Sequence, residues 1–317
     1  MPDALTIYTH PLFRRHDTGF GHPESASRMD YARHGVDRAG LGSSIITAEI
    51  HPDTDRLIAK VHSAQYEREL EEACGAGMRL FHTLDNPISS STWAAARAAV
   101  GSAVGAAEAI WQRGVTQRAF VIARPPGHHA ERVEAMGFCF FNTIACVAEF
   151  LREQPGIERV LIFDFDVHHG NGTQALFEER DDVFYVSTHR YPFYPGTGAA
   201  EDIGTGRGRG FTKNIPFDSG AGDVDYLDAV ETIVVPLIDD YAPDAILLSS
   251  GFDAHRRDPI GGMRVSERAY GEITERLVEA AVRHGGGRIL SLLEGGYDPE
   301  GLAASVAEHV TALESSL

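Results

Sequence analysis

Cysteine is scarce in this 317-residue sequence, and its pattern excludes a protein built on disulfides. Cys74, Cys139 and Cys146 are an odd number, and no two of them have the C-x-x-C spacing, which is typical of a reducing compartment. The N-terminal stretch MPDALTIYTHPLFRRHD lacks the apolar segment of a signal peptide, and no window approaches the roughly 20 apolar residues of a membrane helix. We therefore expect a cytoplasmic protein that does not enter a membrane.

Positive charge is also in short supply. The chain has 28 Lys and Arg against 46 Asp and Glu, a formal net charge of −18. Long-range repulsion makes nucleic acid and anionic membrane surfaces poor partners for such a protein. The same field attracts cationic substrates, although an acidic surface is more often a device for solubility. Charge alone therefore identifies no ligand.

Nothing in the composition divides the chain into parts. Its 43% hydrophobic and 23% charged residues are close to the averages of globular proteins, which excludes a disordered, collagen-like or coiled-coil chain. The length allows one or two domains, but no Pro/Ser-rich linker and no internal repeat separates them. We expect a single domain over residues 1–317, and the sequence makes no prediction of its oligomeric state.

Short apolar runs alternate with longer stretches of helical period. The runs predict strands buried on both faces, at 4–10, 119–125, 159–166, 183–189, 245–253 and 288–297. The longer stretches predict helices at 89–113, 142–154, 223–240, 266–283 and 298–315. The alternation predicts an α/β protein with a parallel sheet covered on both sides. The Gly-rich stretch 196–210 does not join a strand to a helix start, so we interpret it as a surface loop.

Polar residues gather where the predicted strands end. Four strands from distant parts of the chain run into the segments RPPGHHA, DFDVHHGNG, SSGFDAH and EGGY. Ligands of open α/β sheets bind beyond the carboxyl ends of the strands. We therefore expect these four segments to form one site.

Acidic and histidine side chains in two of these segments have the chemistry of a zinc site. Asp164, Asp166 and His168 alternate along a strand end and so face the same side. Asp166 and His168 supply two ligands, and Asp253, directly after a buried strand, is the best candidate for a third. Two Asp and one His would leave the fourth position open, as catalytic zinc requires. Each residue taken alone could instead be a structural acid or a core histidine.

The adjacent histidines His128 and His129 could share base and acid work on a water activated by the metal. Asp164, which the metal set does not use, can hold His128, and Asn171 can hold His129. A carboxylate partner and an amide partner would give the two rings different proton affinities. Tyr297 in EGGY can donate its hydroxyl to an oxyanion, although the alternative is a tyrosine that merely packs.

These segments, with GHPESASR at 21–28 and GFCFFN at 137–142, resemble the zinc-dependent histone deacetylase family. They occur in the family's order and span nearly the whole chain. Asn171 and the segment GFDAHRRDP are most similar to the class II branch and its bacterial homologues. The resemblance implies the arginase/deacetylase fold, a three-layer αβα domain around a mostly parallel eight-stranded sheet. It also implies hydrolysis of acetyl or other short acyl groups from acyl-lysine in proteins or peptides, or from a small acetylated amine.

The resemblance also assigns a role to each candidate residue. It makes Asp166, His168 and Asp253 the ligands of one catalytic zinc ion per chain. It makes His128 and His129 the catalytic dyad, with Asp164 and Asn171 as their partners. It makes Tyr297 the residue that polarises the acetyl carbonyl. It gives a structural potassium ion to the carbonyls around Asp164, Asp166 and His168 and to the hydroxyl of Ser187.

A narrow channel for the acyl-lysine stem follows from the same resemblance. Gly137 and Phe138 line one wall, and Tyr194 stands where the opposite wall usually has Phe. Pro23 in the GHPE segment belongs to the channel, and Arg28 matches an arginine near the acetate exit. The conformation of the channel mouth is not predicted, because the loop that carries Tyr194, at 189–196, is shorter than the family's common form.

Three alternatives compete with an acyl-lysine hydrolase. An acetylpolyamine amidohydrolase suits the acidic surface, but those enzymes usually have a longer N-terminal loop, and Ile260 stands where the polyamine-preferring branch has an acidic rim residue. A ureohydrolase of the arginase type needs a second metal with extra carboxylates, where this chain has His and Gly. A silent acyl-lysine binding module would have lost Tyr297 or a ligand, and all are present.

Overall fold

The computed structural model describes residues 2–315, which contain an eight-stranded sheet and a separate two-stranded hairpin. The strands of the large sheet are β1 (Asp3–Thr9), β2 (Ile45–Thr47), β5 (Thr116–Val121), β6 (Val160–Asp164), β7 (Val183–Arg190), β8 (Thr212–Phe217), β9 (Ala245–Ser250) and β10 (Ile289–Leu293). The hairpin consists of β3 (Leu80–Phe81) and β4 (Thr83–Pro87). The α-helices are α1 (Arg28–Arg38), α2 (Thr54–Val61), α3 (Ala64–Gly75), α4 (Thr92–Trp111), α5 (Thr143–Arg152), α6 (Asn171–Phe177), α7 (Asp223–Ala229), α8 (Val235–Tyr241), α9 (Glu267–His284) and α10 (Pro299–Glu314).

All neighbouring strands of the large sheet run parallel, in the order β2-β1-β5-β10-β9-β6-β7-β8. The central strands β6, β9 and β10 are buried at every residue, as their unbroken apolar sequences predict. The predicted eight-stranded sheet is confirmed, and all of it is parallel. The four strands that carry the polar segments, β5, β10, β9 and β6, are consecutive neighbours in it.

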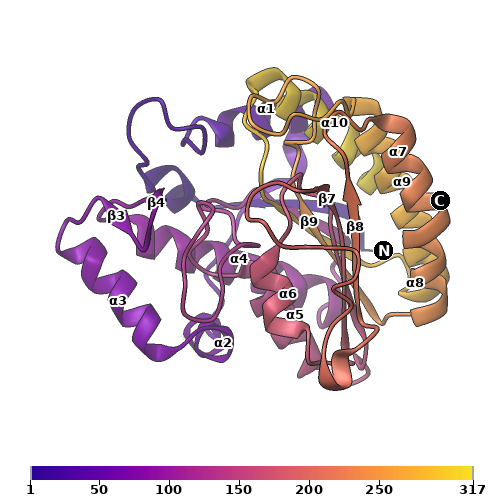
Figure 1. The fold of residues 1–317 in the computed structure, drawn as a ribbon, viewed down its shortest axis with the longest axis horizontal. Coiled ribbons are helices and arrows are strands. Elements are labelled where there is room, and N and C mark those ends of the chain that lie inside the picture. The colour runs from indigo at the N-terminus through magenta and orange to yellow at the C-terminus, as the bar shows by residue number, and fades with distance from the viewer. Residues whose placement is uncertain (1, 316–317) are drawn as a thin grey trace.

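Helices cover both faces of the sheet and give the molecule three layers. α7, α8, α9 and α10 lie on one side, and α2, α4, α5 and α6 lie on the other (Figure 1). α1 packs against α10 and so belongs to the first of these layers. The hairpin and α3 extend beyond the sheet at the left of Figure 1. None of the described helices combines the length and the apolar composition that a membrane crossing needs.

The sequence patterns do not predict β2, β8, the hairpin or the helices α1, α2, α3 and α6. β2 has three residues and is mostly exposed, and the edge strand β8 contains Lys213 and Pro216, so neither shows a buried apolar run. The predicted helix 223–240 contains a π-helical turn at Val230–Val234 between α7 and α8. Pro236 explains this turn, because proline has no N–H and its ring crowds the preceding turn of an α-helix.

Candidate active site

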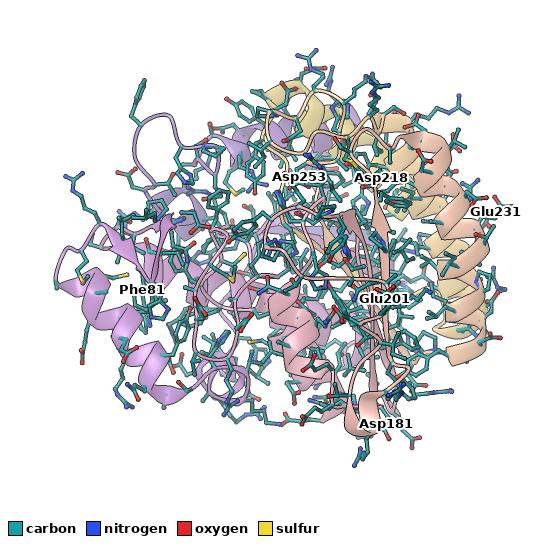
Figure 2. The ribbon with its side chains drawn as sticks, viewed as in Figure 1. Phe81, Asp181, Glu201, Asp218, Glu231 and Asp253 are labelled. Atoms are coloured by element: carbon teal, nitrogen blue, oxygen red, sulfur yellow. The ribbon has the colours of Figure 1, made fainter. Side chains whose placement is uncertain are left out.

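The four predicted polar segments meet at the carboxyl ends of adjacent strands. Asp253 is fully buried, whereas the acids Asp181 and Glu231, labelled with it in Figure 2, lie at the periphery of the molecule. All seven predicted metal and dyad residues are at most 8% exposed, and they are His128, His129, Asp164, Asp166, His168, Asn171 and Asp253. Buried charged groups need partners of opposite charge, and these residues surround one another.

Asp166, His168 and Asp253 form a compact group of ligand-type atoms within 4.8 Å of one another. The Nδ1 atom of His168 lies 3.0 Å from Asp166 Oδ1 and 3.1 Å from Asp253 Oδ2. Zinc bonds of about 2.0–2.2 Å at tetrahedral angles place neighbouring ligand atoms roughly 3.3 Å apart. The three side chains therefore fit a zinc ion with little rearrangement.

The backbone approaches this group so closely that two positions beside it have no room for a side chain. Asp166 Oδ2 accepts a hydrogen bond from Gly295 N at 2.8 Å, and Asp253 Oδ1 accepts one from Val167 N at 2.9 Å. A Cβ atom on Gly295 would lie 2.2 Å from Asp253 Oδ2, and one on Gly251 would lie 2.1 Å from Asp166 Oδ2. The glycines of the SSGFDAH and EGGY segments thus let the chain close over the carboxylates and orient them.

The electrostatics of the group favour a bound cation. Burial and the nearby charge of Asp166 raise the pKa of Asp253 to about 7. Burial favours a neutral His168, but its hydrogen bonds to the two carboxylates outweigh burial and raise its pKa to about 9. Two buried carboxylates therefore favour positive charge between them. The protonated imidazole carries that charge here, and a bound divalent ion would supply it too.

His128 and His129 have the two partners that the sequence suggests. His128 Nδ1 lies 3.0 Å from Asp164 Oδ2, and His129 Nδ1 lies 2.8 Å from Asn171 Oδ1. Burial lowers the pKa of His128, but the charges of Asp164 and Asp166 outweigh burial and raise it to about 10. Burial and the positive charge of His128 hold the pKa of His129 well below its usual range. One ring is therefore charged and the other neutral at neutral pH.

The orientation of Asn171 determines which nitrogen of His129 carries the proton. Asn171 Nδ2 donates to Glu131 Oε1 at 2.7 Å, so its Oδ1 faces His129 and accepts from Nδ1. With the proton on Nδ1, the Nε2 atom of His129 is free to accept one. Glu131 follows the RPPGHHA segment directly, but no sequence pattern indicates this role for it.

Tyr297 lies between the channel wall and a buried guanidinium. Its ring packs edge-on against Phe138 at 6.0 Å between centroids, and Arg28 lies over the ring at 4.9 Å. Its backbone N–H donates to Asp258 Oδ2 at 2.7 Å, and the next residue, Asp298, caps α10. Burial raises the pKa of Tyr297 well above its usual value, with partial opposition from Arg28, so the hydroxyl remains a donor at neutral pH.

Asp85 and Asn86 of β4 hold one wall of the predicted channel. Gly137 and Phe138 both have positive φ angles, of 56° and 69°, and for Phe138 this conformation is strained. Asp85 Oδ2 accepts from Gly137 N at 3.0 Å, and Asn86 Oδ1 accepts from Phe138 N at 2.7 Å. These bonds press Gly137 against the ring of His129, where a Cβ atom would lie 2.2 Å from Cδ2. Neither Asp85 nor Asn86 lies in a recognisable motif.

The loop 189–196 contributes two aromatic rings rather than one. Tyr194 packs edge-on against His129 at 5.3 Å, as expected of a channel wall, and its hydroxyl donates to Asp85 at 2.9 Å. Phe193 stacks on His168 with 5.3 Å between centroids and 16° between planes. Only Tyr194 is expected in the channel from the sequence, because the family pattern places one aromatic before the proline.

A buried charge cluster lies below the site. Glu24 Oε1 accepts from Arg28 at 3.2 Å and from Arg124 at 2.7 Å. Arg28 also donates to Gly296 O at 2.7 Å, so the cluster supports the Tyr297 loop. Pro23 lies between Glu24 and His22, whose ring contacts Phe138 at 4.8 Å. Glu24 and Arg124 stand inside the motif segments, but the sequence reasoning gives them no role.

A second group of ligand-type side chains consists of His128, Cys139 and Glu294. Glu294 Oε2 accepts from Gly127 N at 2.7 Å and from His128 N at 3.2 Å. Burial raises the pKa of the Cys139 thiol well above its usual value, and the thiol donates to a backbone carbonyl. These contacts make the group structural rather than a metal site.

Ser187 and Ile260 each adjoin a residue that belongs to the site or supports it. Ser187 is paired with Asp164 in the register of β7 and β6, next to the backbone of the zinc-type group. Ile260 is partly exposed, and its N–H donates to Asp258 Oδ1 at 3.0 Å. The other carboxylate oxygen of Asp258 accepts from the backbone N–H of Tyr297, so Ile260 belongs to the loop that supports Tyr297.

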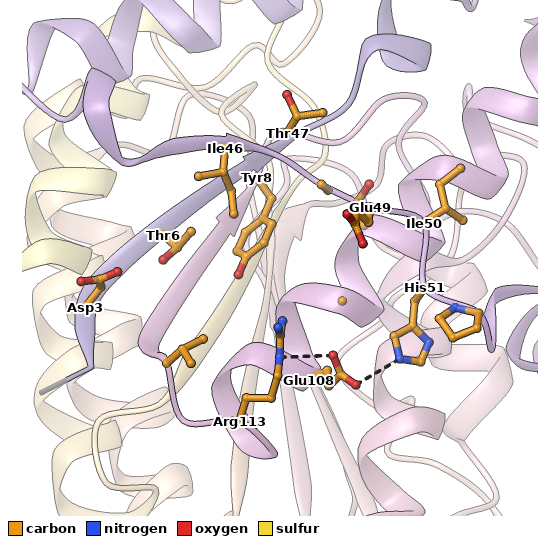
Figure 3. A pocket seen from close by; sticks show the side chains of 15 residues that line it. Asp3, Thr6, Tyr8, Ile46, Thr47, Glu49, Ile50, His51, Glu108 and Arg113 are labelled. Carbon is orange, nitrogen blue, oxygen red and sulfur yellow. Dashed lines mark ion pairs between the residues drawn. The ribbon is translucent and has the colours of Figure 1, made fainter.

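A cavity of about 560 Å³ lies elsewhere, at the β1 and β2 edge of the sheet (Figure 3). Glu108 crosses it between Arg113 at 3.3 Å and His51 at 3.7 Å. The residues that line it include none of the predicted site residues. Its volume alone therefore does not make it the active site.

Known proteins resemble this chain over most of its length. A family model described as the histone deacetylase domain matches residues 22–313. A protein of Archaeoglobus fulgidus named "Probable deacetylase" is 37% identical over 298 residues, which are 93% of this chain and 82% of that protein. A "Histone deacetylase-like amidohydrolase" of Pseudomonas aeruginosa is 38% identical over 278 residues, which are 87% and 73%. The crystal structure of the HDA15 HD domain has a TM-score of 0.92 at 33% identity and covers 98% of this chain and 88% of that one.

The sheet order and its helical layers define an α/β protein with the arginase/deacetylase-like fold. Within that class, the chain belongs to the histone deacetylase family, as the sequence motifs suggest. The family consists of deacetylases and amidohydrolases and is zinc-dependent in general.

Proposed function

We propose that this chain is a zinc-dependent amide hydrolase that removes acetyl or other short acyl groups from acyl-lysine side chains. The observation that carries the proposal is the convergence of Asp166, His168 and Asp253 beside a charged and a neutral histidine. Zinc in such a group supplies Lewis acidity, which polarises a carbonyl and activates water. Three protein ligands would leave a fourth position on a zinc ion open for this purpose.

The side chains around the metal group divide the proton transfers. His129 accepts a proton from water at Nε2 and then passes it to the leaving amine. His128, held in its charged form by Asp164, stabilises the negative charge that develops nearby. Tyr297 donates its hydroxyl to the oxygen of the acyl group as that oxygen becomes negative.

Support for an acyl-lysine substrate comes from the walls of the channel. Phe138 and Tyr194 are aromatic rings beside the site, suited to an apolar stem of four methylene groups. Ile260 offers no charge to a second ammonium group, which a polyamine substrate carries. We also propose that a structural potassium ion binds beside Asp164 and Ser187. These two residues are paired on the neighbouring strands β6 and β7, which brings carbonyl oxygens and the Ser187 hydroxyl close together.

The proposal is tested with the Asp253→Ala variant. Loss of one of three ligands is expected to abolish both stoichiometric zinc and turnover of an acetyl-lysine peptide. Zinc is measured by elemental analysis and turnover by release of acetate. The control is Asp218→Ala, at an exposed acid, which is expected to keep both. Full zinc content and full turnover in Asp253→Ala would contradict the proposal.

A further inference from the structure

Two large apolar side chains beside the channel wall are almost wholly exposed. Phe20 is 111% exposed and Leu84 is 89% exposed, relative to reference values. Each stands near a residue that contacts the wall formed by Gly137 and Phe138. Large exposed apolar side chains that flank a binding channel are candidates for contact with the ligand.

Phe20 is held out from the molecule by a structured loop. Gly19 and Gly21 on either side of it have φ angles of 86° and 79°, which favour glycine. Gly19 N donates to Asp17 Oδ1 at 2.9 Å, which closes a tight turn. His22, two residues later, packs against Phe138 at 4.8 Å. Two residues span at most about 7 Å, so the Cα atom of Phe20 lies within that distance of the Cα atom of His22, whose ring contacts the channel wall.

Leu84 is held out by the β3–β4 hairpin. Phe81, labelled in Figure 2, anchors the hairpin, because it is only 6% exposed and its ring packs against Tyr66 of α3 at 5.8 Å between centroids. Leu84 lies next to Asp85, which accepts from both Gly137 N and the Tyr194 hydroxyl. Leu84 is thus attached to both walls of the channel through one residue.

We propose that Phe20 and Leu84 form an apolar rim that binds the residues flanking the acyl-lysine of a polypeptide substrate. This inference rests on the proposed function and specifies its substrate class, acyl-lysine in a segment with a large apolar residue nearby. An acyl-lysine that reaches the metal group must leave the rest of its chain against the mouth of the channel. Flanking residues one to three positions away then extend up to about 10 Å from it, far enough to meet the rim. A small acetylated amine leaves the rim uncovered.

The experiment compares three substrates of the zinc-loaded protein. They are an end-blocked acetyl-lysine amide, an acetyl-lysine peptide with Leu and Phe in the flanking positions, and the same peptide with Ser there. We expect kcat/KM for the apolar peptide to exceed that for the Ser peptide by about tenfold, which partial burial of one large apolar side chain supplies. The dissociation constants of labelled peptides, from fluorescence anisotropy, should show the same order.

Variants locate the effect. Phe20→Ser and Leu84→Ser are each expected to reduce the preference for the apolar peptide severalfold and to leave turnover of the blocked amide unchanged. Val224→Ser is the matched control, because Val224 is 81% exposed and lies in α7, away from the channel. It should keep the full preference.

Each other outcome has a definite meaning. Equal kcat/KM for the two peptides in the wild type, or an unchanged preference in both rim variants, overturns the rim. An equal loss of kcat/KM for all three substrates in the rim variants also overturns it, because Phe20 and Leu84 would then act by positioning the channel wall rather than by contacting flanking residues. A dimer in sedimentation that Phe20→Ser dissociates shows that a second copy occupies the rim instead. Selective binding of the apolar peptide without hydrolysis of any substrate upholds the rim and rejects the proposed function.

Discussion

Tyr297 is the residue whose substitution separates chemistry from metal binding. Tyr297→Phe keeps the ring that packs against Arg28 and Phe138 and removes only the hydroxyl. Loss of one oxyanion donor is expected to lower kcat about 100- to 1,000-fold. Zinc content should stay stoichiometric, since Tyr297 is not a ligand. Steady-state kinetics and elemental analysis on one sample check both, and an unchanged kcat would make Tyr297 a packing residue.

Ile260 tests the choice between acyl-lysine and polyamine substrates. A carboxylate about 4 Å from an ammonium, at an effective dielectric of about 20, gains about 4 kcal/mol before desolvation and screening reduce it. Ile260→Glu is therefore expected to shift the kcat/KM ratio of acetylspermidine to acetyl-lysine peptide upward by tenfold or more. Val224→Glu, with the same change of charge at a remote exposed site, controls for long-range attraction.

Two results contradict the assignment of Ile260. The first is a wild-type protein that already prefers acetylspermidine. The second is a ratio that Ile260→Glu leaves within twofold, on folded and zinc-loaded protein.

Residues of the site differ in how far the sequence predicts them. Asp166, His168 and Asp253 are polar groups at the ends of apolar strands, where their chemistry and their spacing both indicate a metal site. Asp85 and Asn86 have no such signal, because they come from a hairpin outside the sheet and act through backbone N–H groups of another loop. Contacts between segments distant in sequence depend on the packed fold, which local patterns do not encode.

At the level of elements, the loop after β10 controls how closely the chain approaches the metal group. Gly295→Ala would place a Cβ atom 2.2 Å from Asp253 Oδ2 and 2.6 Å from Asp166 Oδ2. Because one carboxylate or the loop must move, we expect zinc affinity to fall at least tenfold. Competition with a chromogenic chelator measures the affinity. Gly75→Ala is the control, since a Cβ atom there meets nothing within 4 Å, and equal affinities in the two variants would contradict the argument.

The predicted elements were those that bury unbroken apolar runs. The six predicted strands correspond to β1, β5, β6, β7, β9 and β10, and the predicted ends of β5, β6, β9 and β10 extend into the loops of the site. Apolar residues continue there because Phe252 is buried under the site rather than paired in the sheet. Short or edge elements such as β2 and β8 lack the pattern because one side of each is open to solvent.

For the whole molecule, stability should depend on pH through buried neutral histidines. His309 joins three elements, since Nδ1 lies 2.7 Å from Thr274 Oγ1 of α9 and Nε2 lies 2.9 Å from Ser291 Oγ of β10. Burial lowers its pKa to about 3. Below about pH 6.5 the unfolded chain therefore binds a proton at this position that the folded chain does not, and folding weakens as the pH falls toward 3.

His309→Gln isolates this contribution. The variant is expected to be less stable than the wild type at pH 7, because the contacts to α9 and β10 change. The difference in free energy of unfolding should narrow by about 2 kcal/mol between pH 7 and pH 5, since only the wild type loses the histidine contribution there. Urea unfolding at both pH values measures it. A difference that stays constant would show that His309 is not held neutral.

The position of β10 in the sheet has a consequence for how the protein is made. Of the eight strands described for the large sheet, β10 comes last in the sequence, and it lies between β5 and β9, where it joins the group β2-β1-β5 to the group β9-β6-β7-β8. A nascent chain that ends before Ile289 therefore has two separate half-sheets, each with an open apolar edge. The Asp–His–Asp group also lacks Gly295 until then, so the large sheet and the site are completed together, once β10 and the loop after it have been synthesised.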